Sequence, residues 1–128
     1  MADALFDTTV FIDYYRGDSA AHTLMQSVFD GGMTASYSAI TQFEVWAGIT
    51  THEEEIDYLA IMATCEEAVL TSSKARAAAR LLRQITPSRS EGLFRDALIA
   101  ATAMERGETI YTRNARDFRR FNANVRSY

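Results

Sequence analysis

The sequence has few residues that form disulfides or interrupt helices, and it has no long apolar run. It has one cysteine, Cys65, which cannot form an internal disulfide, and one proline, Pro87. No apolar run approaches the roughly 20 residues that a membrane-spanning helix needs. The first residues lack the basic region and the cleavage site of a secretory signal. These absences predict a cytoplasmic protein that does not associate with membranes. Because no linker, repeat or low-complexity tract interrupts the sequence, we expect a single domain over residues 1–128.

Lysine is also nearly absent, and the basic residues are unevenly placed. Residues 1–73 contain twelve acidic residues and one basic residue, a net charge of −11. Residues 74–128 contain five acidic and twelve basic residues, a net charge of +7, and eleven of the twelve are arginine. The planar guanidinium of arginine suits phosphate, so the chain is able to present a phosphate-binding face despite its overall charge of −4. The alternative is that folding mixes the two halves and averages the asymmetry out.

Short β-like runs alternate with longer helical runs along the chain. Strands are expected at 2–6, 34–38, 68–70 and 109–111, with an edge strand at 125–128. Helices are expected at 8–15, from the N-cap Asp18 to about 29, at 40–49, at 53–64, from Ser72 or Ser73 to 85, at 93–106 and from 114 onward. This alternation predicts an α/β fold, a three-layer α/β/α sandwich around a parallel sheet of four or five strands with strand 2–6 in the middle.

Four acidic residues have apolar neighbours, namely Asp7, Glu44, Asp96 and Asp117. Charged side chains are rarely placed near a core unless they are paired or bind metal. Ligand sites in open α/β sheets lie beyond the carboxyl ends of the strands, and Asp7 directly follows the first expected strand. We therefore expect the acids to converge at that edge. Acids without matching lysines indicate a divalent cation, and Mg²⁺ and Mn²⁺ prefer such oxygen ligands.

Each acid also has a plainer explanation. Asp7, like Asn114, fits a helix N-cap, which is common after a strand. Glu44 fits a solvent-facing position on an amphipathic helix. Asp96 fits an ion pair with Arg95 or with another arginine. Each of these alternatives stays open when it is taken alone. That all of them are true at once conflicts with the ordered set of motifs in the chain.

The chain resembles the PIN-domain nucleases, and within them the VapC-type toxins of bacterial and archaeal toxin–antitoxin pairs. Four segments carry this resemblance over nearly the whole chain, in the order that the family has them: residues 7–13 (DTTVFID), 40–45 (ITQFEV), 96–101 (DALIAA) and 111–118 (YTRNARDF). The family often has asparagine where Thr9 stands. Its fourth acidic position aligns in many members with Asn114 rather than with Asp117.

The resemblance implies a PIN-like fold and a Mg²⁺- or Mn²⁺-dependent endoribonuclease that acts as a toxin, with transfer RNA as the substrate expected for the family. It implies that Asp7, Glu44 and Asp96 are catalytic, metal-binding residues. Asn114 and Asp117 share the fourth position in both roles. Further residues are expected around this site: Thr9 and Thr112 to hydrogen-bond a carboxylate or a metal-bound water, and Arg113, Arg116, Arg119 and Arg120 to contact RNA phosphates.

The resemblance also implies two protein partners, a second copy of the chain and a VapB-like antitoxin whose C-terminal segment blocks the acidic site. An apolar surplus in the N-terminal helices supports such interfaces, comprising Phe11, Ile12, Tyr14, Tyr15, Trp46 and Ile49. Two other functions remain open. One is a phospho-accepting receiver-type signalling domain, which needs an acidic pair near its first strand and a lysine after a late strand. The other is a catalytically silent PIN-like binding module.

Overall fold

The structure is a computed structural model that describes residues 2–85 and 91–128. Pro87 lies outside these residues. The elements follow one another as β1 (Ala4–Phe6), α1 (Thr8–Tyr15), α2 (Ser19–Phe29), β2 (Ala35–Ser38), α3 (Ala39–Ala47), α4 (His52–Met62), β3 (Glu66–Ala68), α5 (Ser72–Arg83), α6 (Glu91–Arg106), β4 (Thr109–Tyr111), α7 (Ala115–Arg119) and β5 (Val125–Arg126).

The strands form one five-stranded sheet in the order β3-β2-β1-β4-β5, and every neighbouring pair is parallel. Leu5 in the central strand pairs with Ser36 of β2 on one side and with Ile110 of β4 on the other. This confirms the expected parallel sheet with its first strand in the middle. The carboxyl ends of β1 and β4 therefore lie side by side, which is where the candidate site forms.

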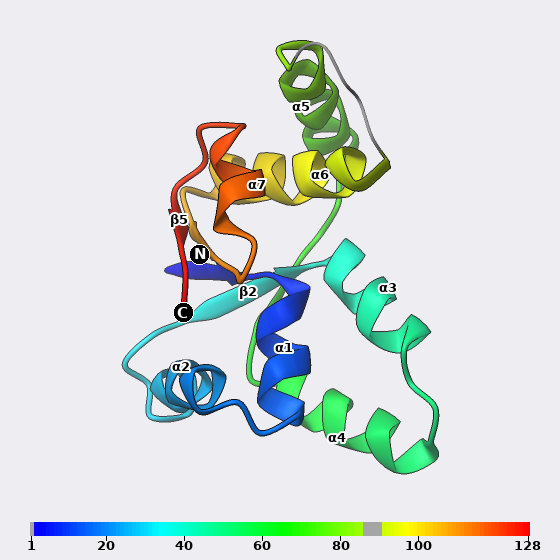
Figure 1. Ribbon diagram of the computed structural model, residues 1–128, viewed down its shortest axis with the longest axis vertical. Helices are drawn as coiled ribbons and strands as arrows, with labels where there is room; N and C mark the ends of the chain where they lie inside the picture. Colours follow the sequence, from blue (N-terminus) through cyan, green and yellow to red (C-terminus); the bar gives the residue numbers. More distant parts are fainter. Residues whose placement is uncertain (1, 86–90) are drawn as a thin grey trace.

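Helices cover both faces of the sheet (Figure 1). Helices α1 to α4 pack on one face around a core that includes Phe6, Phe11 and Met25. Helices α5, α6 and α7 pack on the other face around Leu5, Ile99 and Phe118. Two buried cores separated by a sheet are what a three-layer α/β/α sandwich requires, so the predicted fold class is confirmed.

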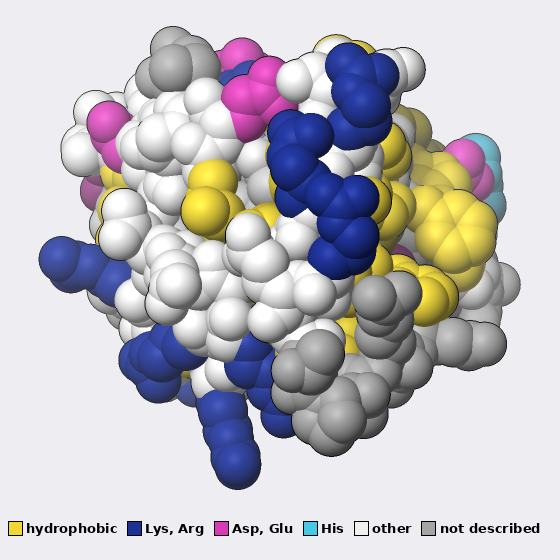
Figure 2. Space-filling view, turned by 90° about the horizontal axis from the view of Figure 1, so that it is seen from above, with side chains coloured by type: hydrophobic (Ala, Val, Ile, Leu, Met, Phe, Trp, Pro, Cys, Tyr) yellow, Lys and Arg dark blue, Asp and Glu magenta, His cyan; other side chains and the backbone are white. Residues whose placement is uncertain are grey.

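The two layers of helices inherit the uneven charge of the sequence. Helices α1 to α4 come from the acidic part of the chain, and α5 to α7 come from the arginine-rich part. Figure 2 looks onto the molecule from above Figure 1, and Lys and Arg side chains gather there in two groups. Folding nevertheless brings part of the two halves together, because Arg95, Arg106 and Arg113 form ion pairs with acids of residues 1–73. The alternative in which the two halves mix is therefore correct in part.

Three local expectations need correction. Strand β3 is Glu66–Ala68, two residues before the expected strand, because pairing with β2 selects these residues and leaves Val69 61% exposed. The N-cap of α5 is Thr71, whose side chain accepts from the backbone N–H of Lys74, whereas Asp18 caps α2 as predicted. The apolar surplus is mostly absorbed: Phe11 is fully buried, and Ile12, Tyr14, Trp46 and Ile49 pack against the first core.

Candidate functional site

Asp7 lies at the carboxyl end of β1 and is fully buried. It is the N-cap of α1, and its Oδ1 accepts from the backbone N–H of Thr8 at 2.8 Å. Its other oxygen, Oδ2, accepts from the hydroxyl of Thr112 at 2.7 Å. The capping interpretation of Asp7 is thus correct but incomplete. A helix cap needs one carboxylate oxygen, and the strand-end position aims the rest of the group at its neighbours.

Arg95, on α6, joins three carboxylates through three different nitrogens. Its Nη2 lies 2.5 Å from Oδ1 of Asp7, its Nε 2.7 Å from Oε2 of Glu44, and its Nη1 2.7 Å from Oδ1 of Asp96. These distances are those of short, charge-assisted hydrogen bonds. Sequence positions 7, 44, 95 and 96 therefore meet at one place, as predicted for the acids, but an arginine lies between them.

Glu44 is held at this place by a second contact. The hydroxyl of Thr8 donates to its Oε1 at 2.6 Å and lies 3.1 Å from the hydroxyl of the buried Thr41. Thr8 also accepts from Nη2 of Arg95 at 3.2 Å. Glu44 is therefore not a free solvent-facing residue, since both of its oxygens have partners. Its side chain is nevertheless 31% exposed, which leaves it the most accessible of the three carboxylates.

The electrostatics of the site follow from this packing. Burial raises the pKa of Asp96 above its ordinary value of 3.8, the charges of Asp7 and Asp117 raise it further, and the guanidinium of Arg95 opposes the rise. Burial works against the charged form of Arg95, but its bonds to Glu44 and Asp7 outweigh that and raise the pKa of Arg95. The arginine is thus a permanent cation, while burial disfavours the ionised form of Asp96.

The fourth acidic position is shared between two residues of unequal placement. Asn114 is the N-cap of α7 but makes no side-chain capping bond, and its backbone N–H donates to Oγ1 of Thr112 at 2.9 Å. Asp117, in the first turn of α7, is close enough for its charge to act on Asp96. Thr9 does not contact the carboxylates, and its hydroxyl accepts from the backbone N–H of Arg113 at 3.2 Å. Thr112 alone of the two expected threonines bonds an acid.

The four arginines expected to contact RNA also differ. The guanidinium of Arg113 lies 3.1 Å from Oδ2 of Asp13 and 2.6 Å from Oδ2 of Asp18, and it donates to the backbone carbonyl of Tyr128. It also lies over the ring of Tyr128 at 4.2 Å. Arg113 therefore ties the last residue to α1 and the start of α2. The remaining three, which are exposed and make no ion pair within the described residues, are Arg116, Arg119 and Arg120.

In residues 2–85 and 91–128, no three Asp, Glu, His or Cys side chains lie close enough together to hold a metal ion as they stand. The guanidinium between Asp7, Glu44 and Asp96 accounts for their separation. The residues nevertheless fit a divalent cation, because the guanidinium is itself a cation on which three carboxylates converge. Carboxylate oxygens are the ligands that Mg²⁺ and Mn²⁺ prefer.

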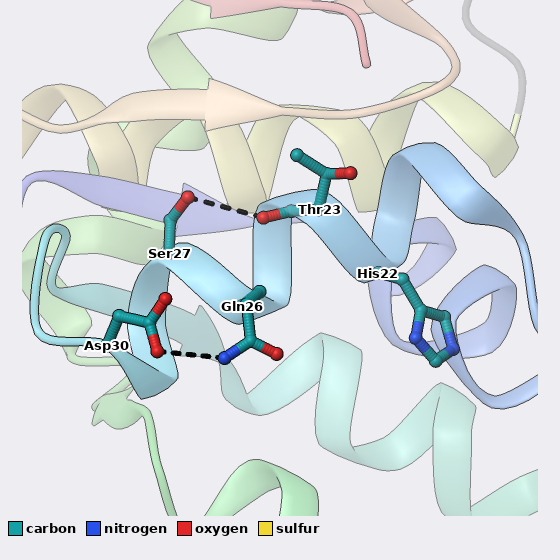
Figure 3. A pocket seen from close by; sticks show the side chains of 5 residues that line it. All are labelled: His22, Thr23, Gln26, Ser27 and Asp30. Atoms are coloured by element: carbon teal, nitrogen blue, oxygen red, sulfur yellow. Dashed lines mark hydrogen bonds between the residues drawn. The ribbon is translucent and has the colours of Figure 1, made fainter.

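The surface pocket in Figure 3 is unrelated to this group. It lies along the outer side of α2, where His22, Gln26 and Asp30 line it together with two hydroxyl residues. The amide of Gln26 donates to Asp30 at 2.8 Å, one turn further along the helix. None of the acids described above lines this pocket, so it adds nothing to the candidate site.

Sequence reasoning missed two participants. Arg95 appeared only as a plain ion-pair partner for Asp96, because its contacts with residues 51 and 88 positions away leave no local pattern. The second is Thr8, which bonds Glu44, whereas the sequence predicted that Thr9 bonds a carboxylate or a metal-bound water. The signal that identifies Thr8 is its place directly after an N-capping aspartate, on the side of α1 that faces α3.

Comparison with known proteins gives consistent matches. A model of the PIN domain family matches residues 4–124. Ribonuclease VapC19 of Mycobacterium tuberculosis is 33% identical over 118 residues, which are 91% of this chain and 93% of that protein.

Solved structures are similar as well. A toxin–antitoxin complex from Klebsiella pneumoniae contains a chain with a TM-score of 0.73 and 25% identity, covering 90% of this chain and 89% of that one. VapBC2 from Rickettsia felis, bound to a DNA fragment from its promoter, gives a TM-score of 0.76 at 18% identity, covering 98% of each chain. The second likeness supports the fold alone.

Proposed function

The chain belongs to the PIN-domain family, and on that premise we propose that it is a metal-dependent endoribonuclease that acts as the toxin of a VapBC-type pair. The relative named a ribonuclease supports the substrate class. The similar toxin–antitoxin complex from Klebsiella pneumoniae, at 25% identity, supports the biological setting. A cytoplasmic location is part of the proposal, and the single, half-buried cysteine, Cys65, is in keeping with it.

The charge of the site is the observation that carries this proposal. Asp7, Glu44 and Asp96 supply three negative charges, and Arg95 supplies one positive charge. Two negative charges stay uncompensated in a place where Asp7 is fully buried and Asp96 nearly so. Excess buried charge of one sign is costly unless a cation balances it. A divalent cation has the charge and the ligand preference to do so.

We assign the three acids different tasks. Asp7 and Asp96 are the better-fixed pair, because Thr112 holds one and the packing of α6 holds the other. They are the residues to bind Mg²⁺ or Mn²⁺, which when bound lowers the pKa of a water and screens the phosphate. Glu44, the most exposed of the three, is the one to orient a water or take its proton. Asn114 and Asp117, at the start of α7, complete the remaining side of the site.

RNA is expected to reach the site across α7. Arg116, Arg119 and Arg120 are exposed there, directly after the strand that ends at the acids. Because guanidinium groups bind phosphate oxygens, these arginines are suited to hold the RNA backbone without reading its sequence. Arg113, whose guanidinium is already bonded, is the least available of the four for this role.

The activity is tested with purified protein and RNA. The wild-type chain should cleave RNA in Mn²⁺ and lose that activity in EDTA. Asp96→Asn should reduce the rate by about 10²-fold or more, because it weakens the ligand set and changes the charge. The matched control is Glu105→Gln, which removes the same charge from an exposed position of the same helix. Equal rates for wild type and Asp96→Asn would refute the proposal, and no cleavage by wild type would favour a silent binding module.

A receiver-type function has less support. The only lysine, Lys74, is buried and donates to the backbone carbonyl of Val69. It lies in α5 and not after a late strand, whereas phospho-acceptor chemistry of that type needs a lysine beside the acids. Labelling with acetyl phosphate should leave the chain unmodified.

We also propose that the chain pairs with itself and with a VapB-like antitoxin. The support is an exposed apolar set that differs from the one expected from sequence. Phe43 on α3 is 72% exposed, and Ile56 and Leu59 on α4 are each 53% exposed. An antitoxin segment is expected to cover apolar residues near α3 and to reach the acids. Light scattering on the free chain and on a co-expressed complex tests both halves, with Phe43→Ser and Ile56→Ser as the variants that should weaken assembly.

A further inference from the structure

The contact between Arg95 and the three acids has a consequence for metal binding that rests on the proposed function. We propose that Arg95 is a built-in competitor of the divalent cation: its guanidinium occupies the acidic site in the metal-free protein and must leave when the metal binds. A residue of the chain itself would then lower the affinity of the site for the divalent cation, independently of any partner.

The geometry supports displacement rather than coexistence. Nε, Nη1 and Nη2 each contact a different carboxylate, at 2.5 to 2.7 Å. A metal ligated by those oxygens would lie where the guanidinium lies, and the two positive charges would repel each other. An arginine has no uncharged form in a protein, so it cannot yield by losing a proton. It can yield only by rotating its side chain away.

The position of Arg95 permits that rotation. Its side chain is 25% exposed, whereas Asp7 is fully buried. The aliphatic part of the arginine is long and flexible, and its head group can move toward solvent while its backbone stays in α6. When the guanidinium rotates outward, it loses three ion pairs. It gains hydration and contact with any phosphate that is bound at the entrance of the acidic site. The acids therefore keep their places while the cation changes.

A second feature shows that this contact is more than a surface ion pair. Thr8 lies 3.2 Å from Nη2 of Arg95 while it bonds Glu44. The guanidinium thus has a fourth oxygen neighbour, and its planar fork is satisfied on three sides. Such an arrangement stabilises the metal-free fold, because it separates carboxylates that would otherwise repel one another. Loss of Arg95 should remove that stabilisation and free the site for metal.

The test compares Mn²⁺ binding and metal-free stability in three variants. Arg95→Met keeps the length of the side chain and removes the charge, and Arg95→Lys keeps the charge but loses the fork. Arg76→Met is the control, since Arg76 is an exposed arginine of α5 outside the site. Affinity is measured by isothermal titration with MnCl₂ and by the electron paramagnetic resonance signal of free Mn²⁺. Thermal unfolding is measured in EDTA, and circular dichroism verifies the fold.

We expect Arg95→Met to bind Mn²⁺ about tenfold more tightly or better, which corresponds to about 1.4 kcal/mol. The same variant should unfold at a lower temperature in EDTA, Arg95→Lys should fall in between, and Arg76→Met should match wild type. Equal, measurable affinity in wild type, Arg95→Met and Arg95→Lys would overturn this inference and leave the nuclease proposal standing. Absence of Mn²⁺ binding in every variant would overturn the metal-dependent function, and the competition with it.

Discussion

Thr112 and Asp7 are joined by a hydrogen bond of 2.7 Å from the threonine hydroxyl to Oδ2 of the carboxylate, across 105 positions of the chain. Both residues are fully buried. The same hydroxyl accepts from the backbone N–H of Asn114. One oxygen atom therefore fixes the orientation of Asp7 and the turn that leads into α7.

Replacing Thr112 by valine should cost both stability and activity. The valine has nearly the same shape but cannot donate, so Oδ2 of Asp7 and the N–H of Asn114 lose a partner. A buried group left unsatisfied costs about 1–3 kcal/mol. Urea unfolding measures that loss, with Thr112→Ser as the control that keeps the hydroxyl. A valine variant as stable as the serine variant would contradict this role.

Thr8→Val should lower the cleavage rate with a smaller effect on stability. The change removes the 2.6 Å bond that orients Glu44, whose side chain is partly exposed and finds water instead. We expect about a tenfold lower kcat and less than about 1.5 kcal/mol of destabilisation. Steady-state kinetics on the valine and serine variants measure this. If Glu44 has no part in the reaction, the two variants will have the same kcat.

Arg113→Ala should release the C-terminus more than it weakens RNA binding. Its guanidinium bonds Asp13, Asp18 and the carbonyl of Tyr128. Without it, carboxypeptidase should trim the last residues faster. Arg116→Ala combined with Arg119→Ala should instead reduce RNA affinity and flatten its salt dependence, because those exposed arginines are the proposed phosphate contacts. The opposite pattern would show that Arg113 is the main RNA contact.

Arg106→Met should destabilise the fold without reaching the acids directly. Arg106 Nε lies 2.8 Å from Oε1 of the buried Glu108, which also accepts from Ser36 at 2.9 Å. This cluster lies at the amino ends of the strands, opposite the candidate site. Removing one member of a buried ion pair strands the other charge and costs about 3–5 kcal/mol. Arg106→Met with Glu108→Leu should recover much of that loss in urea unfolding, and failure to recover it would rule out the stranded charge as the cause.

Much of the fold was predictable because its signals are local. The α1 bounds follow from the residues between Asp7 and Gly17, and Asp18 supplies a side-chain cap that needs no partner elsewhere. Strand β3 was misplaced because apolar content favoured Ala68 and the residues after it. The edge position of β3 instead depends on backbone pairing with β2, so charged side chains at Glu66 and Glu67 are tolerated facing solvent.

The sequence predicts the acids of the candidate site but not the arginine that lies between them. Their motifs identify Asp7, Glu44 and Asp96. The rule that ligand sites in open α/β sheets lie beyond the carboxyl ends of the strands predicts that these acids converge. Arg95 was not assigned to all three, because a residue that is adjacent to one acid in sequence gives no sign of its distance to the other two. Such a contact depends on how α6 and α3 pack across the end of the sheet. Packing of that kind exists only in three dimensions.

The strand order β3-β2-β1-β4-β5 also fixes when the site can exist during synthesis. Asp7 and Glu44 leave the ribosome early, but β1 lacks its second neighbour until β4, Thr109–Tyr111, has emerged. Nascent chains stalled before residue 95 should therefore bind no Mn²⁺ and cleave no RNA, and retained binding by them would contradict this. A ribosome that has not yet released β4 therefore carries an inert product, and the translation machinery meets the assembled site only after residues 109–111 have emerged.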